Sequence, residues 1–299
     1  MRPCRASDSL AVTALFNQRA LRFLGVADTD QADIDAMLTL PGRDLAQVTV
    51  TAWDATGTLV GFGYISHSTN ATITVANTVV DESIEMTPAH RELVELVAQK
   101  AATHRREIIH EVAAADEPLI TVLRDLALRE VRRFDLMTRT FTSKSEAPIW
   151  PVGIEPRPFD IEHDLNDVHH CLTEAFRDHY GGGFRSIEEF QHDLVDQPSF
   201  DPSLVSIAHA NGEIVGTAIS LPTFPEQPGF GYLCDLAVTR EWRRRGLGSA
   251  LLLHSFGRLR EHGCDGCALH VDTDSKTNAS RLYTGAGMTA HTRYVGYGR

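Results

Sequence analysis

Arg243-Arg244-Arg245-Gly246-Leu247-Gly248-Ser249 is the stretch of this 299-residue sequence that decides the fold. It follows a strand-like apolar run, residues 231–238, and opens a helix-like run, residues 250–262. The first N–H groups of a helix have no acceptor within the helix, and the helix dipole places partial positive charge there. Glycine lets the backbone approach a ligand closely, and arginine favours a polyanion. The stretch therefore predicts a phosphate-binding loop.

Residue identity excludes two common phosphate loops. The Walker pattern needs Lys and then Ser or Thr after its last glycine, whereas Ser249-Ala250 follow Gly248 here. The dinucleotide-binding pattern G-x-G-x-x-G would need a glycine where Leu251 stands. The pattern that remains is R-x-x-G-x-G, carried by Arg243, Gly246 and Gly248.

This pattern resembles the pyrophosphate loop of the GCN5-related N-acetyltransferases, the GNAT superfamily. Leu-Ala-Val at 236–238 precedes the loop, as in that family. One strand and one helix later comes Asn278-Ala279-Ser280-Arg281-Leu282-Tyr283, followed by Gly285-Ala286-Gly287-Met288. These residues are similar to the family's N-x-x-A/S-x-x-L-Y-x-x-x-G-F/M signature. The resemblance implies an α/β fold with a mixed sheet, acetyl-CoA as the cofactor, and an acyltransferase activity.

Composition narrows the class of protein and its partners. The net charge of −12 disfavours nucleic acid, because a phosphate backbone demands a basic face. No apolar run approaches the ~18 residues that a membrane span needs. Five scattered cysteines argue against a disulfide framework, and residues 1–5 lack an apolar signal core. We expect a cytoplasmic protein that binds neither nucleic acid nor membrane and exists as a monomer or weak homodimer.

Residues 143–151 are polar and contain two prolines, which predicts a linker. The predicted order of helices and strands is similar on its two sides, so we expect two tandem GNAT domains, residues 1–147 and 152–299. The first domain lacks the motifs: residues 81–87 contain no Gly or Arg and carry three carboxylates, and residues 116–123 contain no Tyr. We expect this degenerate domain to shape the substrate cleft without binding acetyl-CoA.

Two residues are the candidate catalytic groups. The resemblance places the Tyr283 hydroxyl beside the CoA sulfur, where a phenol with a pKa near ~10 can protonate the leaving thiolate. The alternative is a tyrosine that only packs in the core. Asp235 interrupts an apolar strand, which costs free energy unless the charge is used or paired. It either recognises or deprotonates the substrate amine, or pairs structurally with an arginine.

The resemblance also assigns a cofactor-binding set. Backbone groups of the strand before the loop should bond the pantetheine arm, and those of the loop should bind the pyrophosphate. Asn278 is expected on the cofactor arm, and Arg281 or Lys276 on the ribose phosphate or in solvent. The predicted cofactor-binding residues are Leu236, Ala237, Val238, Arg243, Arg244, Arg245, Gly246, Leu247, Gly248, Ser249, Asn278 and Arg281.

Candidate substrate contacts surround the glycine run at 181–183, which forms either a mobile lid or a plain flexible loop. They are His179, Tyr180 and Phe184, and two further candidates are Phe224, in the loop at 222–228, and Tyr232. Many GNATs have a glutamate base at the position of Tyr232, so the residue expected there is missing. Cys264 and Cys267 have no second cysteine pair, and we expect no metal site.

These observations predict an acetyl-CoA-dependent N-acetyltransferase. The layout resembles mycothiol synthases across the chain, and the core from Asp235 to Tyr283 resembles aminoglycoside 3-N-acetyltransferases. Our first expected acceptor is therefore a small polar amine such as an amino sugar or antibiotic. The alternatives are a cysteinyl pseudodisaccharide of the mycothiol pathway, a protein or peptide amine, and a non-catalytic CoA-sensing module.

Overall fold

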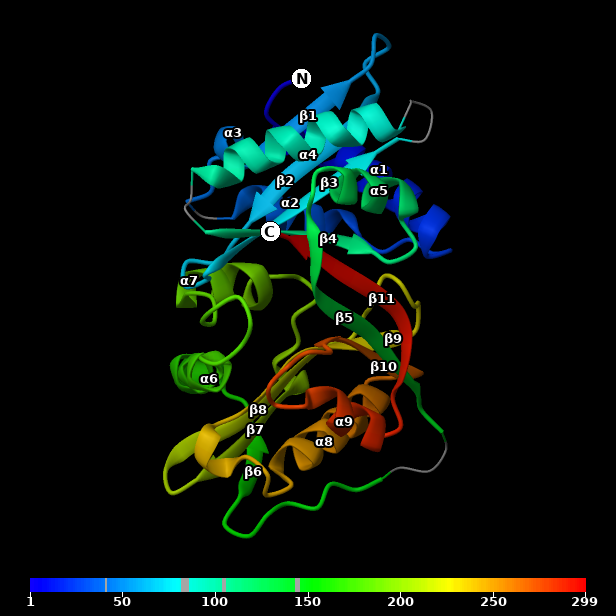
Figure 1. The fold of residues 1–299 in the computed structure, drawn as a ribbon. Coiled ribbons are helices and arrows are strands. Elements are labelled where there is room, and N and C mark those ends of the chain that lie inside the picture. Colours follow the sequence, from blue (N-terminus) through cyan, green and yellow to red (C-terminus); the bar gives the residue numbers. More distant parts are fainter. Residues whose placement is uncertain (41, 82–85, 104–105, 143–145) are drawn as a thin grey trace. The chain divides into compact units, whose positions relative to one another are not determined.

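The computed structural model describes residues 1–40, 42–81, 86–103, 106–142 and 146–299, which form two compact units (Figure 1). Unit 1 comprises Met1–Arg133 and Thr292–Arg299, and unit 2 comprises Phe134–His291. No helix among these described residues is long and apolar enough to cross a membrane.

The elements of unit 1 are α1 (Ser9–Phe23), α2 (Gln31–Thr39), α3 (Leu45–Val48), β1 (Thr49–Trp53), β2 (Leu59–Ser66), β3 (Ile73–Val80), α4 (Met86–Ala102), β4 (Glu107–Ala113) and α5 (Glu117–Asp125). The elements of unit 2 are β6 (Glu155–Pro158), α6 (Ile161–Phe176), α7 (Ile187–Phe190), β7 (Val205–Ala210), β8 (Glu213–Leu221), β9 (Phe230–Val238), α8 (Leu247–Glu261), β10 (Gly266–Asp272) and α9 (Ala279–Gly285). Two strands contain residues of both units: β5 (Arg129–Thr140) and β11 (Thr289–Gly298).

The boundary between the units differs from the predicted linker, of which residues 143–145 lie outside the described residues. The physical reason is strand pairing. Residues 134–140 of β5 pair with β10, so they belong to unit 2 although they precede the linker. Residues 294–297 of β11 pair with β4, so the end of the chain belongs to unit 1.

Both units have the same succession of strand pairings. In unit 1, β1, β2 and β3 pair antiparallel, β3 and β4 pair parallel, and β4 pairs antiparallel with β11. In unit 2, β7, β8 and β9 pair antiparallel, β9 and β10 pair parallel, and β10 pairs antiparallel with β5. Strand β6 adds one more antiparallel edge to unit 2. The predicted mixed-sheet fold with an internal structural repeat is confirmed.

Helices cover both faces of each sheet. In unit 2, Val168 and Leu172 of α6 pack with Ala237 of β9 in one cluster, whereas Leu247 and Leu251 of α8 pack in another. In unit 1, α1 packs on β2 and β3 through one cluster, and α4 packs on the same strands through another. The sheet of each unit therefore separates two helical layers.

Local capping explains where two elements depart from their predicted bounds. The sequence of residues 46–52 predicts a strand, but Asp44 accepts a hydrogen bond from Ala46 N at 2.9 Å, and this cap starts the short helix α3. The apolar residues of 165–176 at helical spacing predict a helix capped by Asp164, but the cap of α6 is Asp160, which accepts from Glu162 N at 3.0 Å. Asp164 instead pairs with Arg157.

Candidate acetyl-CoA and amine site

The site of unit 2 is organised by two strands that diverge. Strands β9 and β10 pair in parallel only from Phe230 with Gly266 to Tyr232 with Ala268. Beyond this point both strands continue, to Val238 and Asp272, with no further pairing between them among the described residues. Strand β9 stays paired with β8 on its other edge up to Val238. One edge of β9 therefore offers backbone groups to a ligand along residues 233–238.

A β-bulge decides which side chains of β9 face which helical layer. The register with β8 shifts between Leu233 and Asp235, which makes Cys234 the extra residue. Leu233, Leu236 and Val238 consequently pack toward α8 and α9, whereas Ala237 packs toward α6. Since Asp235 alternates with Leu236 along the strand, its carboxylate lies on the α6 face of the sheet.

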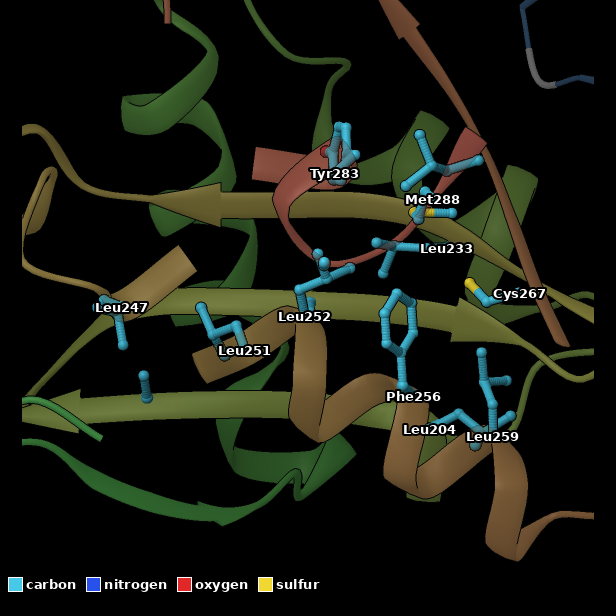
Figure 2. Packing of buried hydrophobic residues seen from close by; sticks show 14 of the residues in the cluster. Leu204, Leu233, Leu247, Leu251, Leu252, Phe256, Leu259, Cys267, Tyr283 and Met288 are labelled. Atoms are coloured by element: carbon cyan, nitrogen blue, oxygen red, sulfur yellow. The ribbon is translucent and has the colours of Figure 1, made fainter. Parts of the chain in front are cut away.

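The two predicted catalytic residues lie on opposite faces of the sheet. Tyr283 of α9 belongs to the cluster that also contains Leu233, Leu252 and Met288 (Figure 2). Burial raises the pKa of Tyr283, and the charges of Cys267 and Asp235 raise it further. The tyrosine and the aspartate are therefore close enough to interact electrostatically, near the part of the sheet where β9 and β10 have separated.

The structure pairs Asp235 with an arginine that sequence reasoning missed. Arg185 Nη2 donates to Asp235 Oδ2 at 3.2 Å. The guanidinium lies over the rings of Phe184 and Phe190, at 4.8 and 5.2 Å from their centroids, which holds it in place. Burial raises the pKa of Asp235, whereas the charges of Arg185 and His179 lower it. Because the net direction is upward, keeping this carboxylate ionised costs folding free energy.

Asp235→Asn is expected to leave the protein at least as stable as wild type at pH 7. A raised carboxyl pKa means that the folded chain binds this proton more tightly than the unfolded chain does. The free energy of unfolding therefore falls as the pH rises from the unfolded pKa of about 3.9 through the raised folded value. The asparagine variant should lose that decline. Urea unfolding between pH 4 and pH 7 measures it.

Asp164→Asn is the matched control in the same unit, and its expected effect on the free energy of unfolding has the opposite sign. Arg157 bonds both oxygens of Asp164 at 2.6 Å and holds its pKa below the usual value. Its stabilisation is present above the unfolded pKa and is lost as the pH falls, so this variant should be less stable at pH 7. An equal loss in Asp235→Asn would instead make the pairing of Asp235 with Arg185 structural.

The predicted phosphate loop has the local geometry of an anion cradle. Gly246 has φ 87° and caps α8, and its backbone oxygen accepts from Ala250 N at 3.0 Å. A Cβ built at Gly246 would meet no atom within 4 Å, so the space beside the loop is open. The helix begins at Leu247, and Gly248 and Ser249 provide its next amides. Leu247 itself is buried.

The three arginines of the loop have different environments. Arg244 is exposed and adopts a left-handed backbone with φ 57°. Arg245 is also exposed and lies over the Trp242 ring at 5.1 Å. Arg243 donates from Nη2 to Ala175 O at 2.8 Å and from Nε to Val238 O at 3.2 Å. Arg243 therefore ties the end of α6 to the end of β9, and this bonding sets the position of the loop.

The second motif starts a helix beside the first. Asn278 precedes α9 with φ 58°, and it is exposed and makes no side-chain capping bond. Arg281 and Lys276 are exposed as well. A Cβ at Gly248 would lie 3.4 Å from Leu282 of α9, so the first turns of the two helices are neighbours. The predicted cofactor residues, apart from the ribose contacts, are thus collected around β9, α8 and α9.

The predicted substrate contacts are partly absorbed by packing. Phe184 belongs to the cluster on the α6 face, and Phe224 stacks on Tyr232 with ring centroids 5.1 Å apart. His179 is exposed, with Nδ1 2.9 Å from Tyr180 O. Tyr232 hydroxyl lies 3.0 Å from Nδ1 of His270, a residue that the sequence did not single out.

The residues present fit an acetyl-CoA molecule. The open space at Gly246 would admit the pyrophosphate to the first amides of α8. The edge of β9 at residues 233–238 has the extended backbone that a pantetheine arm can join as an added strand. Tyr283 belongs to the same cluster as Leu233, where the unpaired edge of β9 begins, and the thioester would lie beside its hydroxyl.

Comparisons with known proteins agree with this geometry. Residues 165–288 match the sequence model of the Acetyltransferase (GNAT) family. A protein named mycothiol acetyltransferase from Thermobispora bispora is 32% identical over 166 residues, which cover 54% of this chain and 56% of the relative. The chain thus spans about half the length of that relative.

Two solved structures share the fold over the whole chain. A GCN5-related N-acetyltransferase from Sphaerobacter thermophilus has a TM-score of 0.78 at 24% identity and covers 100% of this chain and 94% of its own. A tandem GNAT protein from the clavulanic acid biosynthesis pathway has a TM-score of 0.70 at 14% identity, with 100% and 97% covered. Residues 165–288 therefore match the GNAT acetyltransferase family, and the whole chain is similar in fold to a tandem GNAT protein.

Proposed function

We propose that this protein is an acetyl-CoA-dependent N-acetyltransferase that transfers the acetyl group directly to a primary amine of a small polar molecule. The observation that carries the proposal is the divergence of β9 and β10 between an open helix N-terminus at Gly246 and the buried hydroxyl of Tyr283. Bound acetyl-CoA would supply an activated acetyl thioester. The chain would supply binding, orientation and proton transfer.

The two faces of the sheet support a division of roles. Tyr283, on the α8 and α9 face, keeps its proton at neutral pH because its pKa is raised, and it can protonate a thiolate. Asp235, on the α6 face, offers a carboxylate to an ammonium group. An amine approaching from the α6 face would meet the thioester in the gap between the strands. A backbone N–H of residues 236–238 would polarise the acetyl carbonyl.

The side chains of unit 1 support a single cofactor site per chain. Strands β3 and β4 also stop pairing, after Ala76 with His110. Arg19 of α1 bonds the fully buried Asp116, which follows β4 and precedes α5, with Nε 2.9 Å from Oδ2. Asp116 also caps α5 through Leu119 N, whereas Asn278 makes no such bond. The predicted loop of unit 1 at 81–87 includes residues 82–85, which lie outside the described residues.

The name of the matched relatives favours one acceptor among the small amines. Because they are called mycothiol acetyltransferases, we propose a cysteinyl amine of a mycothiol-type compound as a candidate beside the amino sugar or antibiotic amine. An antibiotic acceptor would make the protein a resistance enzyme. Tyr283 argues against a purely CoA-sensing module, since sensing needs no acid at the sulfur. We propose a cytoplasmic location, because acetyl-CoA is made inside the cell.

Gly248→Val is expected to weaken acetyl-CoA binding at least about tenfold, or ~1.4 kcal/mol. The Cβ of a residue at 248 lies 3.4 Å from Leu282 and 3.8 Å from Val238, so the valine methyl groups would crowd these side chains and displace the first turn of α8, whose amides would bind the pyrophosphate. Gly257→Val is the matched control, because Gly257 lies in the same helix and a Cβ there meets nothing within 4 Å. Isothermal titration calorimetry measures both affinities and should give one acetyl-CoA per wild-type chain.

Thiol release from acetyl-CoA then identifies the acceptor. The panel is L-cysteinamide, D-glucosamine, kanamycin and a short peptide with a free amino terminus. Turnover with one of the first three supports the proposed class. Turnover with the peptide alone moves the function to protein acetylation, and binding without any turnover favours the sensing module. Absence of acetyl-CoA binding by the wild-type chain would contradict the proposal itself.

A further inference from the structure

A tyrosine, a histidine and a phenylalanine from three segments of unit 2 meet on the α6 face of the sheet, here called the amine face because the proposed substrate amine would approach from it. The Tyr232 hydroxyl lies 3.0 Å from His270 Nδ1. Phe224 stacks on Tyr232 with an interplanar angle of 9° and packs edge-on against His270 at 6.3 Å. This arrangement fixes the imidazole from two sides, although His270 is an exposed residue.

The position of His270 relates it to the gap between the strands. Tyr232 and Ala268 are the last paired residues of β9 and β10, and His270 is the next residue of β10 on the same face as Ala268. Its neighbours Leu269 and Val271 pack in the cluster of α8 and α9, so His270 faces the opposite layer. That layer is the one in which Asp235 meets Arg185. His270 therefore stands where an amine would reach the gap.

We infer that His270 accepts the proton of the substrate ammonium group through Nε2, and that Tyr232 is a positioning residue that holds its Nδ1. This inference rests on the proposed acetyltransferase function. The N–H bond of the ammonium breaks, its electron pair stays on the amine nitrogen, and the proton forms the imidazolium. The neutral amine can then attack, and the imidazolium later releases the proton to water.

The two neighbouring groups are suited to other roles. Burial raises the pKa of Tyr232, followed in effect by the charges of Cys234, Asp235 and Glu226, so its hydroxyl is a poor proton acceptor and a stable hydrogen-bonding partner. Asp235 already shares Oδ2 with Arg185, which suits it to anchoring an ammonium. His270 keeps an exposed part, but the surrounding chain removes some of its hydration, which lowers its pKa and keeps the ring neutral at pH 7.

The role requires one tautomer. If Nδ1–H donates to the Tyr232 oxygen, the lone pair of the neutral ring is on Nε2 and can take a proton. Long-range ¹H–¹⁵N correlation spectra of histidine-labelled protein at pH 7.5 distinguish the tautomers, with the His270 signal assigned by its loss in His270→Gln. We expect the Nδ1–H tautomer in the wild type and a tautomer mixture in Tyr232→Phe. The Nε2–H tautomer in the wild type would overturn the inference.

Kinetics provide the second test, using the panel amine with the highest turnover. His270→Gln is expected to lower kcat/KM about 10²-fold or more at pH 7 with an unchanged acetyl-CoA Kd. The loss should shrink as the pH approaches the pKa of the amine, because solvent then supplies neutral amine. His254→Gln is the control, since His254 contacts Ser206 and Trp150 elsewhere in the unit.

Wild-type kcat/KM in His270→Gln at every pH would overturn the inference and leave the proposed acetyltransferase function intact. Failure of the wild type to acetylate any panel amine would count against the proposed function instead. The tautomer spectra are recorded without a substrate amine. They therefore test the role of His270 even if no panel amine is acetylated.

Discussion

Tyr283→Phe is expected to lower the turnover of acetyl transfer by about 10²- to 10⁴-fold, the usual contribution of a positioned general acid. The ring of Tyr283 packs among Leu233, Leu252 and Met288, and phenylalanine preserves this packing (Figure 2). The variant should therefore keep its stability and its acetyl-CoA affinity while kcat falls. Because the hydroxyl has a raised pKa, the wild-type rate should not decline across neutral and mildly alkaline pH.

Tyr297→Phe provides the control for removing a buried phenol. Tyr297 is as buried as Tyr283 but packs in unit 1, with Val295 and Leu119. Its variant should retain full turnover. If Tyr283→Phe also retained full turnover with the same amine, the tyrosine would be a packing residue of the core and the thiolate would have to take its proton from solvent.

Arg19→Met should cost unit 1 about 3–5 kcal/mol of unfolding free energy. Asp116 has no exposed surface, and the substitution leaves its carboxylate buried with the hydrogen bond from Leu119 N but without its arginine. Methionine keeps most of the aliphatic volume, so the loss reports on the uncompensated charge. Combining Arg19→Met with Asp116→Asn should recover much of the stability, because the second change removes that charge. Chemical denaturation of the three variants measures both effects.

Arg91→Met is the control that removes an exposed ion pair without leaving a buried charge. Arg91 Nη2 lies 3.3 Å from Asp125 Oδ2, but the two side chains are 40% and 56% exposed. Such surface pairs contribute about 0–1 kcal/mol. If Arg19→Met cost no more than Arg91→Met, water would reach Asp116 in solution and the carboxylate would not depend on Arg19 for compensation.

Local signals were sufficient to predict the backbone geometry of the glycine loop. The glycine loop requires a particular backbone and a helix start immediately after it, and α8 begins at Leu247 with Gly246 at positive φ. Asn211-Gly212 likewise predicted the turn between β7 and β8, and both residues have positive φ. The unit 2 strands near the loop were predicted within a few residues, because their apolar runs are bounded by polar turns.

Contacts distant in sequence could not be predicted in the same way. Arg185 and Asp235 are fifty residues apart, and nothing in either segment names the other. His270 stands in an apolar strand. It lies on the same face of the sheet as Asp235 because the bulge in β9 turns Asp235 to that face. The available sequence signal for His270 was that it is a polar residue within an apolar strand. The sequence also could not show that the Arg243 side chain bonds two backbone carbonyl oxygens instead of facing a phosphate, because this depends on where α6 ends.

The exchange of strands between the halves of the sequence has a consequence for synthesis of the chain. Unit 1 includes Thr292–Arg299, whose strand β11 pairs with β4 through residues 294–297. A nascent chain emerging from the ribosome therefore cannot complete its first unit until its last residues have been translated. Because domains generally fold as units in the order of translation, the open edge of β4 stays exposed throughout elongation. Unit 2 is complete once residue 291 has been translated, so the second unit in the sequence can finish folding before the first.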